Sequence, residues 1–183
     1  MNHFLQFGLC LAVLSGLSLP SESSISSPEV KTPAEILKLM EGSWEGNVRT
    51  WFKPGSLDDE STVKGKFTPI LGGRFLRHEY IGSMKGKPRT GEETIVYNKM
   101  VKKFEVSWFD DFHMNYGILF SVGPLIDSGF SVTGKYAYGD QVWGWRTEYK
   151  LIDKDHLTIT AYNVTPQGEE LKGVETVYHR VSR

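Results

Sequence analysis

Alternating apolar and polar residues run through the chain after Gly42, and this period of two predicts β-strands. Short turn sequences rich in Gly, Pro, Asn and Asp separate the alternating segments. No helical pattern between them is long enough for a crossover between parallel strands, so we expect an antiparallel meander. The expected strands cover residues 43–53, 61–71, 74–83, 91–98, 103–109, 116–123, 129–138, 142–152, 156–164 and 171–181.

One short helix is expected before the strands. Thr32-Pro33-Ala34-Glu35 forms a capping box with proline at the first helical position. An apolar stripe follows over residues 36–40, and Gly42 ends the helix. A helix of this length packs on a larger body or plugs it.

The pattern predicts an all-β protein, an antiparallel up-and-down β-barrel of about ten strands with one short N-terminal helix. Closure into a barrel leaves no strand edge exposed. An open two-sheet sandwich is the alternative, but a sandwich needs one dry inner face. The strand faces here mix aromatic, charged and small residues, which favours a barrel with a polar or wet lumen.

The N-terminal segment differs from the rest of the chain. From Phe4 to Leu19 it is uncharged and mostly apolar, and it is shorter than the about 20 residues that a membrane span needs. This pattern is typical of a signal peptide. We expect a signal peptide over 1–21, a flexible linker over 22–31 and a single β-barrel domain over 32–183. An uncleaved N-terminal anchor is the alternative.

Charge and cysteine content narrow the function classes. The formal net charge of the 183 residues is -1, so no bulk field attracts nucleic acid or an anionic membrane. The only cysteine is Cys10, within the expected signal peptide. A mature chain therefore has no disulfide, no cysteine nucleophile and no cysteine metal site.

Several strings of residues follow one another over most of the expected barrel domain: Gly42-Ser43-Trp44-Glu45-Gly46, Arg49-Thr50-Trp51-Phe52, Leu71-Gly72-Gly73-Arg74-Phe75-Leu76, Trp143-Gly144-Trp145-Arg146-Thr147-Glu148 and Ile159-Thr160-Ala161-Tyr162-Asn163. In this order they resemble a bacterial family of unknown function, DUF1579. The resemblance implies a lipocalin-like or calycin-like barrel with a short helix near its N-terminus. It implies no catalytic residues, because no activity is established for the family as a whole.

Two strands carry paired Arg and Glu residues on one face, Arg77 with Glu79 and Arg146 with Glu148. If these faces line the lumen, the pairs anchor a carboxylate or another polar head group while aromatic residues hold an apolar body. The alternative is that they form cross-strand pairs on the solvent surface. The candidate ligand-binding residues are Arg77, Glu79, Glu92, Trp108, Trp145, Arg146, Glu148, Tyr162 and Glu175.

Other chemistry has weaker support. Asp110, Asp111 and His113 follow an aromatic strand end, where a turn is a simpler interpretation than a metal site or an acid–base pair. His78 and His179 are the positions for a haem ligand, but no haem-attachment motif accompanies them. We expect no catalytic residues, no metal and no cofactor.

The sequence therefore predicts an exported protein, secreted or periplasmic, that binds a small, partly apolar, amphipathic ligand in its lumen. It predicts no nucleic-acid partner and no stable membrane span after removal of the signal peptide. One alternative is an enzyme that acts on a small substrate with Arg and Glu residues of the lumen. The other is a non-catalytic barrel that contacts a protein partner through outer aromatic residues. An enzyme is the less favoured interpretation.

Overall fold

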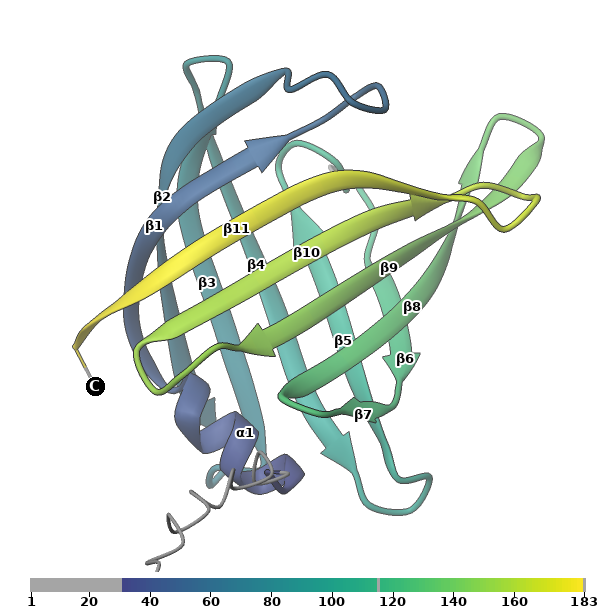
Figure 1. Cartoon of the computed structure of the whole chain (residues 1–183). Helices are drawn as coiled ribbons and strands as arrows, with labels where there is room; N and C mark the ends of the chain where they lie inside the picture. The colour runs from purple at the N-terminus through teal and green to yellow at the C-terminus, as the bar shows by residue number, and fades with distance from the viewer. Residues whose placement is uncertain (1–30, 115, 183) are drawn as a thin grey trace, which may run out of the picture.

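Residues 31–114 and 116–182 are described by a computed structural model, and within them the chain forms one helix and eleven strands (Figure 1). The expected signal peptide, and the expected linker apart from Lys31, lie outside these residues. The elements are α1 (Pro33–Met40), β1 (Gly42–Thr50), β2 (Asp59–Ile70), β3 (Phe75–Met84), β4 (Lys87–Asn98), β5 (Lys103–Asp110), β6 (Leu119–Gly123), β7 (Leu125–Ile126), β8 (Gly129–Tyr138), β9 (Gln141–Leu151), β10 (His156–Val164) and β11 (Glu170–Ser182).

The strands form one closed antiparallel barrel (Figure 1). From β1 to β6 and from β7 to β11, strands that follow one another in the sequence pair with one another, and β1 also pairs with β11. The ring closes between β6 and β8, where Ser121 lies opposite Gly134 and Val122 opposite Thr133. The short strand β7 pairs with β8 only and branches from the ring. The predicted up-and-down barrel is confirmed, and the open sandwich is wrong.

Strand bounds agree with the sequence pattern within two residues, except at the end of β1 and at the starts of β4 and β6. β4 begins at Lys87 instead of residue 91. β1 ends at Thr50 instead of residue 53, because the Phe52 amide donates to Asp58 Oδ2 at 2.7 Å and Lys53 bridges to Ser56. β6 begins at Leu119 instead of residue 116. The segment before it is held by hydrogen bonds to Asp110, which compete with strand pairing.

Helix α1 closes one end of the barrel (Figure 1). The predicted capping box is confirmed, since the Glu35 amide donates to Thr32 Oγ1 at 3.3 Å and the Thr32 amide donates to Glu35 Oε2 at 2.7 Å. Met40 is fully buried, and its carbonyl accepts from Trp44 Nε1 at 2.8 Å. The Arg180 guanidinium donates to the carbonyls of the last helical turn. No helix in the described ranges is long and apolar enough to cross a membrane.

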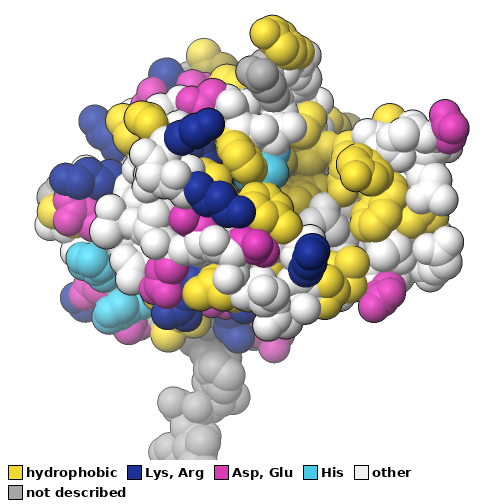
Figure 2. Space-filling view, turned by 90° about the horizontal axis from the view of Figure 1, so that it is seen from above, with side chains coloured by type: hydrophobic (Ala, Val, Ile, Leu, Met, Phe, Trp, Pro, Cys, Tyr) yellow, Lys and Arg dark blue, Asp and Glu magenta, His cyan; other side chains and the backbone are white. Residues whose placement is uncertain are grey.

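The opposite end of the barrel is hollowed, and in a view from above hydrophobic side chains line much of the hollow (Figure 2). The loops between β1 and β2, β5 and β6, and β8 and β9 lie at this end, which we call the mouth (Figure 1). The expected alternation of faces therefore encloses a space that is filled at the helix end and open at the mouth.

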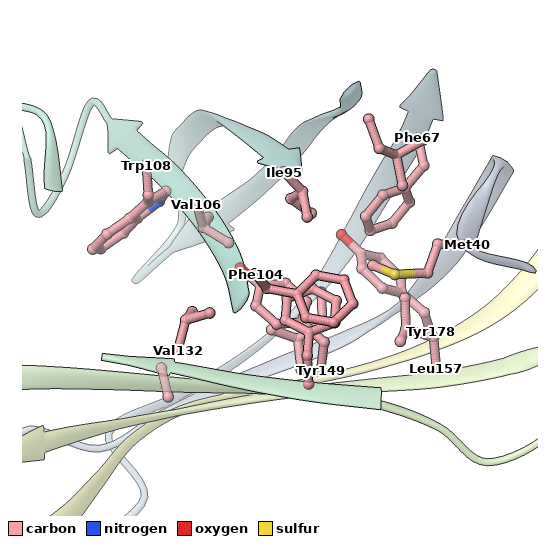
Figure 3. Close-up of a cluster of buried hydrophobic side chains, with 14 of the residues drawn as sticks. Met40, Phe67, Ile95, Phe104, Val106, Trp108, Val132, Tyr149, Leu157 and Tyr178 are labelled. Carbon is pink, nitrogen blue, oxygen red and sulfur yellow. The ribbon is translucent and has the colours of Figure 1, made fainter. Parts of the chain in front are cut away.

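Buried aromatic and aliphatic side chains fill the helix end, and those from opposite walls point toward one another (Figure 3). The rings of Phe104 and Phe130 stack with centroids 4.1 Å apart, and the ring of Tyr149 stacks on Phe130 at 4.4 Å. Burial of such rings contributes the largest hydrophobic term per residue. The stacked rings thus stabilise the closed end of the barrel.

Met40→Ala tests the packing of the helix plug. The variant removes a fully buried side chain from the closed end and is expected to lower the free energy of unfolding by about 2–5 kcal/mol. Lys38→Ala is the control, because the Lys38 side chain is 76% exposed and its loss should cost less than about 0.5 kcal/mol. Urea unfolding of both variants measures the difference. Equal effects would show that α1 does not seal the barrel.

Candidate functional site

A cavity of about 60 Å³ lies among inward-facing side chains in the middle of the barrel. We call it the inner cavity. Its apolar wall comes from residues of β1, β2, β10 and β11, such as Val48, Val63 and Ile159. Its polar wall comes mainly from β3, β4, β9 and β11. The polar residues used below are His78, Tyr80, Arg89, Glu93 and Tyr178.

A larger space of about 440 Å³ opens at the mouth, and we call it the outer hollow (Figure 2). Its volume falls in the range of small-molecule sites. Aromatic rings line most of it, including Trp51, Phe52, Tyr136 and Trp143. The inner cavity and the outer hollow adjoin, because both are lined by Trp108, Trp145 and Val174.

A buried carboxylate, that of Glu93, is the centre of the polar wall. Glu93 Oε2 lies 2.7 Å from His78 Nδ1, and Oε1 accepts from the Tyr149 hydroxyl at 2.7 Å. The other ring nitrogen of His78, Nε2, lies 3.3 Å from the Tyr178 hydroxyl. The imidazole also stacks on the ring of Phe67 at 3.9 Å. These contacts hold the carboxylate and the imidazole in one orientation.

The tyrosines around this carboxylate stay protonated. Burial, followed by the charge of Glu93, raises the pKa of Tyr149 well above its usual range. Burial and Glu93 act in the same way on the pKa of Tyr178. Burial also raises the pKa of Tyr80, and the positive charge of Arg89 opposes it. The three hydroxyls are therefore neutral hydrogen-bond donors and acceptors at any physiological pH.

Two glycines make room for these polar tips. A Cβ atom at Gly65 would lie 2.6 Å from the Tyr178 hydroxyl and 3.0 Å from His78 Nε2. A Cβ atom at Gly91 would lie 2.2 Å from the Tyr80 hydroxyl. The distances to the two tyrosine hydroxyls are too short for van der Waals contact. Glycine at position 65 of β2 and position 91 of β4 therefore makes room for the tyrosine rings.

Arg89 brings a guanidinium to the same cavity. Its side chain is 8% exposed, its Nε lies 3.3 Å from Asp110 Oδ2, and its guanidinium carbon lies 5.4 Å from the ring centroid of Tyr80. The Nε–H is not aligned for a hydrogen bond. Tyr80 in turn accepts from Trp108 Nε1 at 2.9 Å, which connects the guanidinium to the tryptophan pair at the outer hollow.

Asp110 holds the loop between β5 and β6 at the mouth. Its Oδ1 accepts from the amides of Phe112, His113 and Met114, and its Oδ2 lies 2.9 Å from His113 Nδ1. Burial would raise the pKa of Asp110, but the hydrogen bond and charge of His113, the Met114 amide and Arg89 together lower it to about 2. The carboxylate is therefore charged at neutral pH, and it fixes the His113 ring beside Trp108 and Trp145.

The structure separates the nine candidate residues into two groups. Trp108 and Trp145 face the interior, where their rings stack with centroids 5.4 Å apart. The other seven lie on the outer face of the barrel, since their strands present the neighbouring residues inward. These are Arg77, Glu79, Glu92, Arg146, Glu148, Tyr162 and Glu175.

Four of the outer candidates contact one another or other surface residues. Arg146 lies 2.6 Å from Glu170 and 3.2 Å from Glu148, and its guanidinium carbon lies 4.3 Å from the ring centroid of Tyr162. Glu175 pairs with Arg49 at 3.8 Å and with Lys172. These are surface pairs, as the alternative interpretation expected, although Arg146 with Glu148 and Lys172 with Glu175 lie within one strand. Such pairs contribute about 0.2–1 kcal/mol each.

Glu79 lies directly opposite Glu92 on the outside of β3 and β4. Arg77 lies opposite Thr68 and Thr94 on the same face. These placements follow from the parity of β3, because Leu76 and His78 take the inward positions. The hypothesis that Arg77 and Glu79 line the lumen is therefore wrong.

Most residues of the polar wall were not predicted from the sequence. His78 entered only as a haem-ligand alternative, while Arg89, Glu93, Tyr149 and Tyr178 were not assigned to a site. The alternation of side chains along β4 could have placed Glu93 inside the barrel, because Glu93 shares its face of the strand with the fully buried Ile95. Arg89 lies before residue 91, where the pattern placed the start of that strand.

The end of β5 and the loop after it, with Asp110, Asp111 and His113, have a structural role. Asp110 orients the loop, and Asp111 accepts from the amide and hydroxyl of Thr90 at 2.9 Å. His179 is exposed on the outer face of β11. Within the described ranges, no group of three or more His, Cys, Asp or Glu side chains is placed to hold a metal ion.

These features define a class: a closed antiparallel β-barrel, plugged by a short helix, whose interior carries a polar cavity beneath an aromatic mouth. The chain belongs to the DUF1579 family of proteins of unknown function, whose family model matches residues 29–180. The resemblance inferred from the sequence strings is thereby confirmed. No curated protein matches the chain.

Two solved structures are similar to parts of the barrel. One is a redesigned β-barrel, 11% identical, with 82% of this chain and 99% of that chain covered and a TM-score of 0.47. The other is a Nostoc punctiforme protein of unknown function from the DUF3598 family, 8% identical, with 82% and 100% covered and a TM-score of 0.25.

Gly65→Ala tests whether the glycine admits the polar tips. The new methyl group must displace Tyr178 and His78, so the free energy of unfolding is expected to fall by about 1–3 kcal/mol. Gly82→Ala is the matched control on the next strand, where the nearest atom to a Cβ lies 3.2 Å away. Its effect should stay below about 1 kcal/mol. Thermal unfolding measures both, and equal losses would contradict the steric argument.

Asp110→Asn tests the charged loop anchor. A carboxyl whose pKa is lowered to about 2 on folding stabilises the protein above its unfolded pKa, and this stability is lost as the pH falls through the folded value. The variant should therefore be less stable than the wild type by about 2 kcal/mol at pH 7. The gap should close as the pH falls from about 5 to about 2. A gap of constant size over that range in denaturant titrations would show that the charge of Asp110 is not responsible.

Proposed function

We propose that this protein is an exported β-barrel that binds a small, partly apolar ligand in its interior. The observation that carries the proposal is the outer hollow of about 440 Å³, whose aromatic walls continue into the polar inner cavity. An apolar recess with a few converging polar groups is the usual form of a small-molecule site. The uncharged apolar segment from Phe4 to Leu19 supports export.

The walls of the outer hollow suit a flat or chain-like apolar body. Trp108 and Trp145 stack nearly parallel, with an interplanar angle of 12°. Trp143 lies two residues from Trp145 on the same face of β9, nearer to the mouth. Indole rings bury a large area at a low cost in conformational entropy. A ligand that enters at the mouth therefore meets rigid aromatic surfaces before it meets the polar wall.

Catalysis by the paired Arg and Glu residues has no basis in this geometry. Arg146 and Glu148 face outward and are paired with each other and with Glu170, so they do not converge on a cavity. The polar groups that do converge belong to the inner cavity, and their contacts are those of a rigid binding wall. Ligand binding is therefore the function that the arrangement supports best.

Binding of the neutral fluorophore N-phenyl-1-naphthylamine tests the proposal, because its emission increases on transfer from water to an apolar site. The wild type is expected to bind it saturably with a stoichiometry of one. Trp143→Ala should weaken binding about tenfold, since it removes an aromatic wall of the outer hollow. Val142→Ala is the matched control, because the adjacent Val142 is 59% exposed and lies outside the hollow.

Emission that rises without saturation would contradict the proposal. So would equal affinities of the Trp143→Ala and Val142→Ala variants, because the fluorophore would then be bound outside the barrel.

A further inference from the structure

We infer that the inner cavity takes a carboxylate, held by Arg89, so that the ligand is an apolar molecule with an anionic head group. This inference rests on the proposed function, since it names the chemical class of the ligand that the barrel binds. It begins from the one guanidinium that lines the inner cavity.

The guanidinium of Arg89 is buried but poorly satisfied. It carries five N–H donors, and its charge is permanent at physiological pH. Its one ionic contact is Nε to Asp110 Oδ2 at 3.3 Å, and that N–H is not aligned for a hydrogen bond. The Nε atom is buried without a hydrogen-bond partner, and no hydrogen bond of this side chain is found within residues 31–114 and 116–182. A buried cation with this many free donors is stabilised by an acceptor that enters the cavity.

The acidic partner of Arg89 is already occupied. Asp110 accepts from three backbone amides and from His113, so its oxygens do not depend on the guanidinium. The ring of Tyr80 covers one side of the guanidinium at 5.4 Å. The planar edge of the guanidinium remains as the donor surface, and this fork matches the two oxygens of a carboxylate.

The buried carboxylate of Glu93 also has partners other than Arg89. Both oxygens of Glu93 are engaged, by His78 Nδ1 and by the Tyr149 hydroxyl, each at 2.7 Å. The Tyr178 and Tyr80 hydroxyls beside the cavity are neutral, because burial raises the pKa of each. The wall around Arg89 therefore offers hydroxyl donors. The oxygens of its carboxylates, Glu93 and Asp110, already have hydrogen-bond partners of their own.

The volumes of the inner cavity and the outer hollow limit the size of the ligand's head group and of its apolar tail. A volume of about 60 Å³ holds a few waters or one carboxylate head group but no ring system. The apolar body must then lie in the adjoining outer hollow of about 440 Å³, past Trp108 and Trp145. The arrangement describes a monocarboxylate with a phenyl-sized or short-chain apolar tail.

Displacement of bound N-phenyl-1-naphthylamine by three molecules with one tail tests this inference: 6-phenylhexanoate, 6-phenylhexan-1-ol and 6-phenylhexylamine. In the wild type at pH 7, the acid is expected to compete at least about tenfold better than the alcohol, as a bidentate charged hydrogen bond would give. The amine should compete worst. Equal competition by acid and alcohol, or tighter binding of the amine, would overturn the inference.

Two variants connect the preference to the guanidinium. Arg89→Gln is expected to lose the preference for acid over alcohol, which is the ratio of the two competition constants measured within that variant after its own affinity for the fluorophore has been determined. Arg89→Lys retains the charge without the fork of donors. Its preference for acid over alcohol should be smaller than that of the wild type and larger than that of Arg89→Gln. Arg74→Gln is the control, because Arg74 is exposed in the turn between β2 and β3 at the other end of the barrel. An acid preference that survives in Arg89→Gln would place the head group elsewhere.

The outcomes separate the two proposals. If the fluorophore itself does not bind saturably to the wild type, the proposed function fails before the head group is tested. If it binds and the three competitors do not differ, the barrel binds apolar molecules and the inference about Arg89 is wrong. The comparison of competitors on the wild type distinguishes these outcomes even where a variant does not fold.

Discussion

The carboxylate of Glu93 lies inside a β-barrel, and the rest of the interior depends on how it is held there. An ionised carboxylate in such a place is costly unless donors surround it. His78 and Tyr149 supply them from β3 and β9, two strands that lie on different sides of the ring. The polar tips require space, and Gly65 leaves it. An apolar core of close-packed side chains fills the helix end but stops where this cluster begins.

The two ends of the barrel therefore differ in structure, with a packed helix end and an open mouth. Stacked rings such as Phe104 and Phe130 stabilise the closed end, together with the helix that packs below them. At the mouth, Asp110 fixes a loop instead of a strand, and the loop brings His113 to the tryptophan pair. Because the loop anchor and the buried guanidinium share one ion pair, the shape of the mouth and the charge of the cavity are set together.

Most of the fold could be predicted from the sequence, because period-two alternation and turn residues are local signals. The capping box at Thr32 and the strand starts at residues 103, 129 and 156 are examples. The two-residue strand β7 and the late start of β6 at Leu119 were not predicted. β7 lies beside β8, where the Ser131 amide donates to the Pro124 carbonyl. The loop before β6 is longer than the pattern indicates, because Asp110 accepts from the amides that follow it.

The site was harder to predict, because a mixed strand has no obvious inner face. The Arg146 and Glu148 side chains gave a strong chemical signal but face solvent, while Trp145 beside them faces the interior. The residues of the polar wall come from separate strands, and His78 and Tyr178 are 100 positions apart. Only the closed ring brings them together, so their convergence is a property of register and parity and not of any motif.

A crystal structure of the protein with 6-phenylhexanoate would show whether the interior binds an apolar carboxylate. We expect the ligand to lie inside the barrel, with its carboxylate oxygens within about 3 Å of the Arg89 guanidinium nitrogens and its phenyl group among the tryptophans of the outer hollow. A barrel interior filled by water alone, or a ligand whose carboxylate points out of the mouth into solvent, would contradict it.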